Sequence, residues 1–291
     1  MIVAGFIMAR THWLGRNFWD GCERLIYFVL FPALLFAALT RTNFAAGQTA
    51  LMVQISVVAT LGATGLAVLT LWIPRMNRTD WASGIQCAFR FNSYVAFALA
   101  TRAAGSEGLA LMALIVGVVV PMVNILAVSF LANTFHPAKL FRELSRNPLL
   151  LATLTGIAAN LLGVHPPDLI YGVLDRASSA SIALGLMCVG AGLSFKGFLS
   201  ATLRWYAAAI TAIKLIALPA ITWGLCVWLD LLGVQRDMAI LFATMPCASS
   251  AYILATRMGG NGPLAAGLIS LSTITSMATI TVWFAVLQNV G

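Results

Sequence analysis

The sequence predicts an all-α polytopic membrane protein with ten transmembrane helices, the first one truncated, in two inverted repeats of five helices. Three observations predict this fold: an apolar composition, ten apolar segments, and a register of 155 residues that relates the two halves. Hydrophobic residues make up 60% of the 291 residues and charged residues 9%, against roughly 45–50% and about 25% in soluble domains. The lipid bilayer is therefore the expected solvent of most of the chain.

Ten apolar segments are the predicted spans, since about 20 apolar residues cross a bilayer. They cover residues 1–9, 24–41, 49–74, 81–102, 108–134, 148–164, 177–195, 205–229, 238–257 and 263–289. The longest polar connection, 136–148, is too short to form a core of its own. We therefore expect one membrane transport domain over residues 1–291, with repeat one at 1–134, repeat two at 148–291 and a cytoplasmic linker at 135–147.

The first segment, 1–9, is too short to cross a membrane at about 1.5 Å per residue. It also lacks the basic start and cleavage pattern of a signal peptide. A half-span or an upstream start codon explains such a truncated helix.

A shift of 155 residues lays the spans at 49–74, 81–102 and 108–134 on the last three spans. Between 96 and 110, eight of fifteen positions are identical, and the phrases "AFALATRAAG" (96–105) and "AYILATRMGG" (251–260) correspond. Their arginines, Arg102 and Arg257, are typical of helix C-termini. Because five spans is an odd number, the second copy enters the bilayer in the opposite direction. Inverted repeats place a substrate site near the midplane, between the copies.

Lys and Arg are distributed unequally over the connections: eleven lie in odd-numbered connections and four in even-numbered ones. Positively charged loops face the cytoplasm, so odd connections are predicted to be cytoplasmic and both termini to lie outside the inner membrane. The net charge of +8 then reflects this topology, and no nucleic-acid partner is expected.

The two remaining basic residues, Arg90 and Lys214, lie deep in spans and have no counterpart in the other copy, where Met245 and Ala59 occupy their positions. Charges at such depth cost at least about 2.5–3.5 kcal/mol and normally face a cavity or a partner. All nine acidic residues lie at span ends or in connections, so the pattern favours an anionic substrate. Two alternatives stay open: Lys214 reaches an interface with its long stem, and Arg90 packs on small polar residues of neighbouring helices.

Pro246, in "ATMPCASSAYIL", removes a backbone donor and should break the span at 238–257. Polar side chains follow the break, and "RFNS" faces it through the inverted repeat. Asn124 adds a polar group to the span at 108–134, with simple packing as its alternative. The predicted substrate-binding residues are Arg90, Asn92, Ser93, Asn124, Lys214, Pro246, Ser249 and Ser250.

No catalytic residue, metal site or cofactor is predicted. The five cysteines lie in or beside apolar segments without CxxC spacing, which is typical of small core residues. The three histidines share no helix face, and neither an HExxH motif nor a nucleophile–base arrangement occurs. We therefore do not expect an enzyme.

Four stretches lie in order along almost the whole chain: "FPALLFAALTRTNF" (31–44), "FRFNSYVAFALA" (89–100), "NPLLLATLTGIAANLLGVHPP" (147–167) and "MPCASSAYILATRMGGNGPLAAGLISLSTITSM" (245–277). Together they resemble bacterial members of the auxin efflux carrier family. The resemblance implies ten helices in two inverted repeats with helices four and nine broken and crossing, as in sodium-proton antiporters and bile-acid sodium symporters. It also makes Asn92 the asparagine of the first crossing helix and Pro246 the proline of the second. The chain departs from the family in two ways, the short first span and the absence of proline between Trp81 and Arg102.

The resemblance implies transport of a small organic anion, malonate or malate in the bacterial relatives. We expect a secondary carrier that moves a mono- or dicarboxylate across the inner membrane by alternating access. Alternatives are a sodium-coupled symporter of the bile-acid type and a non-transporting membrane sensor. A homodimer is left open.

Overall fold

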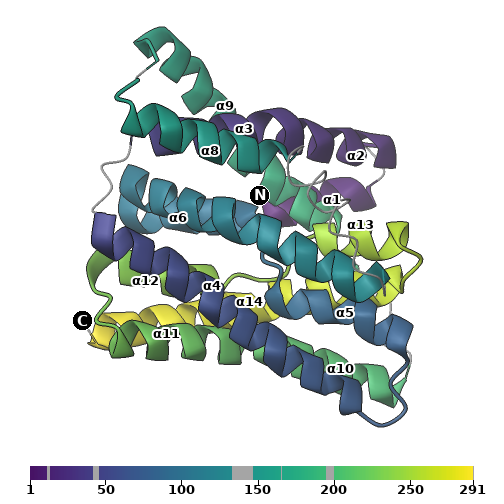
Figure 1. Ribbon diagram of the computed structural model, residues 1–291. Helices are drawn as coiled ribbons and strands as arrows, with labels where there is room; N and C mark the ends of the chain where they lie inside the picture. Colours follow the sequence, from purple (N-terminus) through teal and green to yellow (C-terminus); the bar gives the residue numbers. More distant parts are fainter. Residues whose placement is uncertain (12–13, 42–45, 133–146, 165, 195–199, 291) are drawn as a thin grey trace. The chain divides into compact units, whose positions relative to one another are not determined.

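The computed structural model describes residues 1–11, 14–41, 46–132, 147–164, 166–194 and 200–290, and all regular secondary structure in these ranges is helical (Figure 1). This confirms the predicted all-α class. Six helical stretches are long and apolar enough to cross a membrane: Asn17–Thr40, Gly47–Trp72, Arg78–Ala132, Asp168–Ala191, Ala201–Trp228 and Gly262–Val286. The described residues thus support an integral membrane protein without establishing the predicted count of ten spans.

Two predicted spans, 81–102 and 108–134, correspond to a run of helix that is interrupted at residues 90–92 and again at 104–105. It consists of α5 (Arg78–Phe89) and α6 (Ser93–Ala132). Inside α6 the backbone leaves helical geometry at Ala104 and Gly105, where φ of Gly105 is 58°. This left-handed conformation suits glycine, so the predicted boundary between the spans is present as a kink.

Three other predicted spans are short helices. The stub at 1–9 is α1 (Ile2–Arg10), and the span at 148–164 is α8 (Pro148–Leu161). The span at 238–257 is divided into α12 (Gly233–Ala243) and α13 (Ser250–Arg257). The predicted linker 135–147 lies outside the described residues except for Asn147, whose side chain caps α8 by accepting from the backbone N–H of Leu149 at 3.0 Å.

The chain forms two compact units, each assembled from segments distant in sequence. Unit 1 comprises residues 1–45, 97–121 and 136–193. It holds α1, α2 (Arg16–Leu25), the π-helical turn η1 (Ile26–Leu30), α3 (Phe31–Thr40), the middle of α6, α8 and α9 (Asp168–Ala191).

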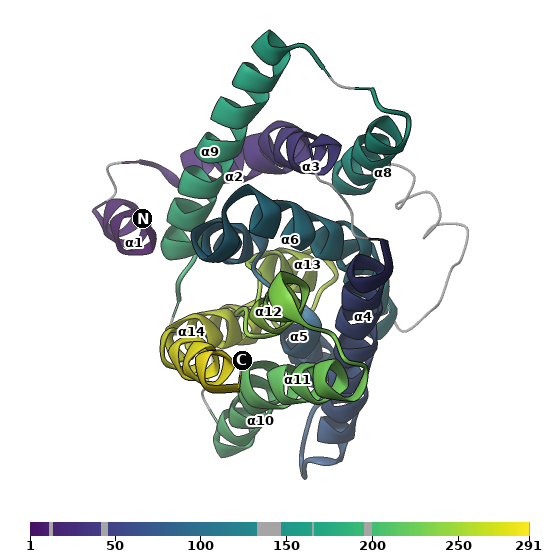
Figure 2. The ribbon, with the colours of Figure 1, turned by 90° about the vertical axis from the view of Figure 1, so that its left-hand side faces the viewer.

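Close backbone approach holds the helices of unit 1 together. Helix α1 lies against α9 (Figure 2), where a Cβ on Gly5 would collide with the backbone of Met187 and one on Gly190 with that of Ile2. Helix α8 packs on α3, and Asn160 of α8 donates to the carbonyls of the last two residues of α3 at 2.9 and 3.1 Å. The amide therefore satisfies carbonyls that a helix end leaves open.

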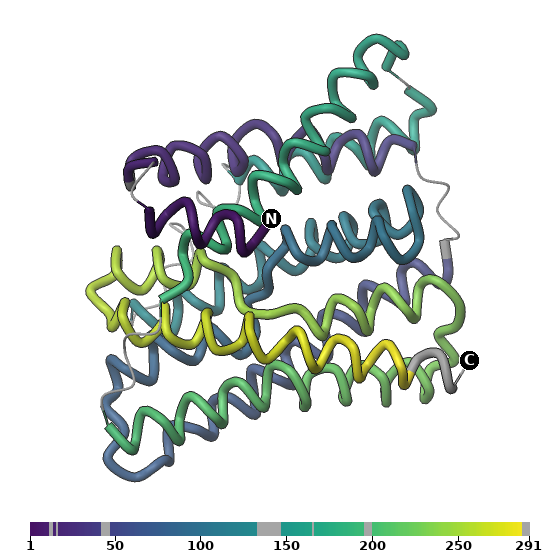
Figure 3. Tube along the Cα trace, turned by 180° about the vertical axis from the view of Figure 1, so that it is seen from behind, coloured from purple at the N-terminus to yellow at the C-terminus, as the bar shows by residue number. Residues whose placement is uncertain are grey.

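Unit 2 comprises residues 46–96, 122–135 and 194–291. It holds α4 (Ala46–Val68), the 3₁₀ turn η2 (Leu69–Trp72), α5, both ends of α6, α10 (Ala201–Ala212), the π-helical turn η3 (Ile213–Ala217), α11 (Leu218–Trp228), α12, α13 and α14 (Gly262–Val290). Figure 3 shows the continuous α10–η3–α11 helix running beside α14. Small residues of α4, Ala59 and Ala63, form a buried cluster with Leu218 and Ala243.

Polar contacts join α5 to other helices of unit 2. The hydroxyl of Tyr206 on α10 donates to the carbonyl of Trp81 at 2.7 Å. Asn261, which precedes α14, donates from its side chain to Asp80 at 2.8 Å and from its backbone to the hydroxyl of Ser83 at 2.7 Å. The first turns of α5 are therefore attached to both α10 and the start of α14.

Each π-helical turn begins six residues before a proline: η1 at Ile26 before Pro32, and η3 at Ile213 before Pro219. Proline lacks an N–H and clashes with the carbonyl four residues earlier. The chain instead forms wider bonds, from the N–H of Phe31 to Ile26 and from that of Leu218 to Ile213. The prolines therefore account for the two π-helical turns.

The predicted role of the cysteines as core residues is consistent with their surroundings. All five are buried and none forms a disulfide: Cys22, Cys87, Cys188, Cys226 and Cys247.

Candidate functional site

Unit 2 contains a break between α5 and α6, although no proline lies there. Helix α5 ends at Phe89, and Arg90 has an extended backbone with ψ of 147°. The side chain of Asn92 then accepts from the backbone N–H groups of Tyr94 and Val95 at 3.1 and 3.3 Å. This is an N-cap, which starts a new helix by satisfying its open donors. The break therefore coincides with an asparagine cap in a segment that contains no proline.

A second break separates α12 from α13 at the predicted position. Residues 244–249 are non-helical and include Pro246. The hydroxyl of Ser272 on α14 accepts from the backbone N–H of Cys247 at 3.2 Å. The two breaks meet directly, because the backbone N–H of Asn92 donates to the carbonyl of Pro246 at 2.8 Å. Each break thus uses a backbone group of the other.

Arg90 lies at this junction and is only 5% exposed. One terminal nitrogen of its guanidinium donates to the hydroxyl of Ser250 at 2.7 Å, and the other to the side-chain oxygen of Asn124 at 2.8 Å. Three of the predicted site residues, from α6, α13 and the first break, therefore contact one another within unit 2. Both of these partners are neutral, so neither cancels the positive charge.

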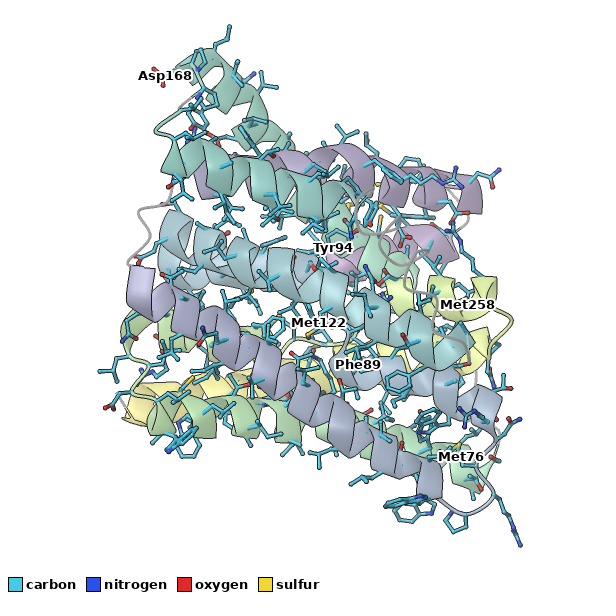
Figure 4. The ribbon with its side chains drawn as sticks, viewed as in Figure 1. Met76, Phe89, Tyr94, Met122, Asp168 and Met258 are labelled. Atoms are coloured by element: carbon cyan, nitrogen blue, oxygen red, sulfur yellow. The ribbon has the colours of Figure 1, made fainter. Side chains whose placement is uncertain are left out.

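Figure 4 shows the surroundings of the junction. The labelled Phe89 and Tyr94 flank the first break in sequence, and the labelled Met122 lies two residues before Asn124 on α6. The ring of Phe91 packs edge-on against that of Phe242 on α12, with centroids 4.6 Å apart. Within the cluster Arg90 is buried, Asn124 is half-buried and Ser250 is exposed.

Lys214 lies on η3 and is fully buried. Its side chain therefore does not reach a membrane interface. The alternative in which the long stem of Lys214 extends to an interface required such an exposed position. Among the described residues its Nζ has no hydrogen-bond partner. The structure thus places a second basic group inside unit 2, without a hydrogen bond to the Arg90 cluster.

Two further predicted residues, Ser93 and Ser249, lie beside the two breaks. Ser93 is the first residue of α6 and Ser249 precedes α13, and both are half-buried. The hydrogen bonds of Arg90 given above go to Ser250 and Asn124. The predicted role of Ser93 and Ser249 in binding stays a prediction.

Sequence reasoning missed Gln86. This fully buried residue of α5 donates from Nε2 to the carbonyls of Ser83 and Ala251, both at 3.1 Å. It therefore attaches α5 to the first turn of α13 beside Ser250. Its position four residues before Arg90 in a mostly apolar span is a signal that could have identified it.

The hydroxyls of residues 270–276 on α14 also contribute near the second break. Ser272 donates to the carbonyl of Ile269 at 2.9 Å, and it also supports the second break through Cys247. One hydroxyl can donate and accept at once, so both roles coexist.

The chemistry of the junction is that of an oxygen-rich ligand. Arg90 presents a guanidinium, and Asn92 has a buried side-chain nitrogen with no partner among the described residues. These are hydrogen-bond donors, and a guanidinium matches the geometry of a carboxylate. The described residues contain no cluster of three or more His, Cys, Asp or Glu side chains that could hold a metal ion.

Comparisons with known proteins agree with a transport role. The sequence pattern of the family described as "Membrane transport protein" matches residues 110–284. An "Uncharacterized transporter" of Methanothermobacter thermautotrophicus is 23% identical over 292 aligned positions, which cover 99% of this chain and 95% of that protein. A "Putative malonate transporter" of Rhizobium meliloti is 26% identical over 145 positions, covering 48% of this chain and 43% of that protein.

Proposed function

Because the chain belongs to the membrane transport protein family, the family of the auxin efflux carriers, we propose that it is a secondary carrier for a small organic anion, a mono- or dicarboxylate. The observation that carries the proposal is the convergence of Arg90, Asn124 and Ser250 where two broken helices meet. Donors fixed in this way need no rearrangement to receive a carboxylate, and preorganisation of this kind favours affinity.

The distribution of charge supports an anion. The parts of the sequence that form unit 2 contain only three acidic residues, Asp80, Asp230 and Asp237, and all three lie at or beyond span ends. Asp80 is bonded by Asn261 and Asp237 by Arg236. Arg90 and Lys214 are buried in the same unit. A carboxylate that entered it would offset part of the cost of these positive charges.

The proposed architecture is the ten-helix inverted repeat with crossing helices four and nine. The bond between Asn92 and Pro246 joins the two breaks as a crossing of this kind requires. The 155-residue register, in which three spans of each half correspond, supports the inversion. The excess of basic residues in odd connections supports an inner-membrane orientation with both termini outside.

The carrier works by alternating access, and the membrane potential supplies a driving force. An inside-negative potential favours outward movement of a monoanion by about 2.3 kcal/mol per 100 mV. Export therefore proceeds without a coupling ion. The name of the Rhizobium meliloti relative suggests malonate as the first substrate to test.

The test is flux of labelled malonate in proteoliposomes under an imposed potential. Arg90→Ala should abolish the flux while the protein remains folded. Arg257→Ala, which removes an exposed arginine at the end of α13, is the matched control and should leave it intact. Unchanged flux in Arg90→Ala would contradict the proposal, and flux lost when choline replaces sodium would instead support a sodium-coupled symporter.

A further inference from the structure

The amide of Gln86 has a fixed orientation. Its Nε2 lies 3.1 Å from two backbone carbonyls, those of Ser83 and Ala251. Carbonyls only accept, so both contacts require the nitrogen side of the amide. The Oε1 atom must then point the other way, where it has no partner among the described residues.

This oxygen differs in kind from the other buried atoms without a partner. The described residues contain ten such side-chain atoms, and Gln86 Oε1 is the one that can only accept a hydrogen bond. The others are nitrogens that donate or hydroxyls that do both. A buried acceptor left open is costly, so its retention needs a reason.

Gln86 belongs to the junction described above. It lies on α5 four residues before Arg90, and its backbone carbonyl accepts from the N–H of Arg90 at 2.8 Å. Its amide bonds to Ala251, whose neighbour Ser250 bonds to Arg90. Gln86 is therefore bonded to Arg90 through its backbone and to the neighbour of Ser250 through its amide, which makes it part of the junction.

Asn92 supplies the complementary atom. Its oxygen caps α6, which turns Nδ2 outward as an open donor. The junction thus offers donors for a carboxylate and one acceptor that a carboxylate cannot satisfy. A ligand that fills every open group carries a carboxylate and, next to it, a hydroxyl.

We propose that Gln86 accepts a hydrogen bond from a hydroxyl of the transported anion, so that the carrier selects hydroxycarboxylates over carboxylates of the same shape without the hydroxyl. The inference rests on the proposed function and narrows its substrate class. Selection follows because a site built to bond a substrate hydroxyl rejects the analogue that leaves its buried group unpaired.

The experiment compares matched ligands on the purified full-length protein by isothermal titration calorimetry. Glycolate and propionate differ by a hydroxyl in place of a methyl group, and hydroxymalonate and methylmalonate form the equivalent dicarboxylate pair. We expect the hydroxylated member of a pair to bind at least about tenfold more tightly. Methoxyacetate, which keeps the oxygen but cannot donate, should bind as weakly as propionate.

Two variants test the residue. Gln86→Leu should reduce the affinity ratio within each pair to about one, because the acceptor is gone. Gln54→Leu makes the same change at an exposed position of α4 and should preserve the ratio. The ratio is the readout because loss of the bond to Ala251 changes the affinity of both ligands together.

The outcomes separate the two proposals. Equal binding of glycolate and propionate by the native protein, with affinity that depends on Arg90, overturns the role of Gln86 and leaves the anion carrier standing. This result also follows if water satisfies Oε1. A ratio that persists in Gln86→Leu overturns the assignment as well, whereas no binding of any carboxylate overturns the proposed function. If Gln86→Leu does not fold, the ligand pairs on the native protein still decide.

Discussion

Replacing Lys214 by methionine should stabilise the protein while weakening anion binding. The ammonium is fully buried on η3 and has no hydrogen-bond partner among the described residues, so no hydrogen bond in the described structure offsets its desolvation. Insertion scales place that cost at about 2.5–3.5 kcal/mol for a lysine at the centre of a membrane helix. Methionine has a similar length and an adaptable shape, so the substitution leaves little cavity. At about 2–4 °C per kcal/mol, we expect the melting temperature to rise by roughly 5–14 °C.

Thermal unfolding of the purified protein measures the first effect, and calorimetric titration with hydroxymalonate measures the second. Affinity should fall at least about tenfold, equivalent to 1.4 kcal/mol. Arg204→Met removes an exposed basic residue of α10, and Leu215→Met changes the buried neighbour of Lys214; neither should raise the melting temperature. A lower melting temperature for Lys214→Met would refute the reasoning, because it would mean that the ammonium stabilises the folded state.

Three further predictions, two of them with a comparison variant, test the packing. Gly190→Ala should lower the melting temperature, because its Cβ would collide with the backbone of α1. Gly172→Ala on the same helix has open space around it and should raise the free energy of unfolding by about 0.5–1 kcal/mol. Asn261→Ala removes both the bond to Asp80 and the cap of α14, and it should lower the free energy of unfolding by about 2 kcal/mol, measured by thermal unfolding. Asn261→Ser keeps a capping oxygen and should lower it less. Tyr206→Phe removes one hydrogen bond to a backbone carbonyl of α5 and should cost about 1 kcal/mol in the same assay, and a cost near zero would show that this bond does not hold α10 to α5.

The all-helical membrane class could be predicted from composition, because a chain with so few charges has no alternative to buried backbone bonds in lipid. The span count could not be fixed in the same way. Hydropathy does not distinguish a kink from a loop, and two predicted spans are separated only by the non-helical backbone of Ala104 and Gly105. It also does not register a helix divided at its midpoint, as between α12 and α13.

The sequence alone could identify those residues of the candidate site whose type is unusual inside an apolar span. Arg90 is identifiable because a charge deep in a span is rare, and Pro246 because it removes a donor. Gln86 was missed because its importance depends on a contact with Ala251, 165 residues away in sequence. The first break was expected without a visible cause, since a capping asparagine becomes recognisable only when its two backbone partners are known.

The π-helical turn η3 also constrains how the α10–η3–α11 helix tolerates changes in length. Its bond from Leu218 to Ile213 encloses one residue more than an α-helical turn. Trp283 on α14 donates to the carbonyl of Leu215, the one that Pro219 cannot use. Deleting one residue from 213–217 would remove the extra residue and restore an α-turn. Pro219 would then follow an uninterrupted α-helical turn, in which its ring clashes with the carbonyl four residues earlier and it has no N–H to donate, so a deletion here is expected to be less well tolerated than one in a connection.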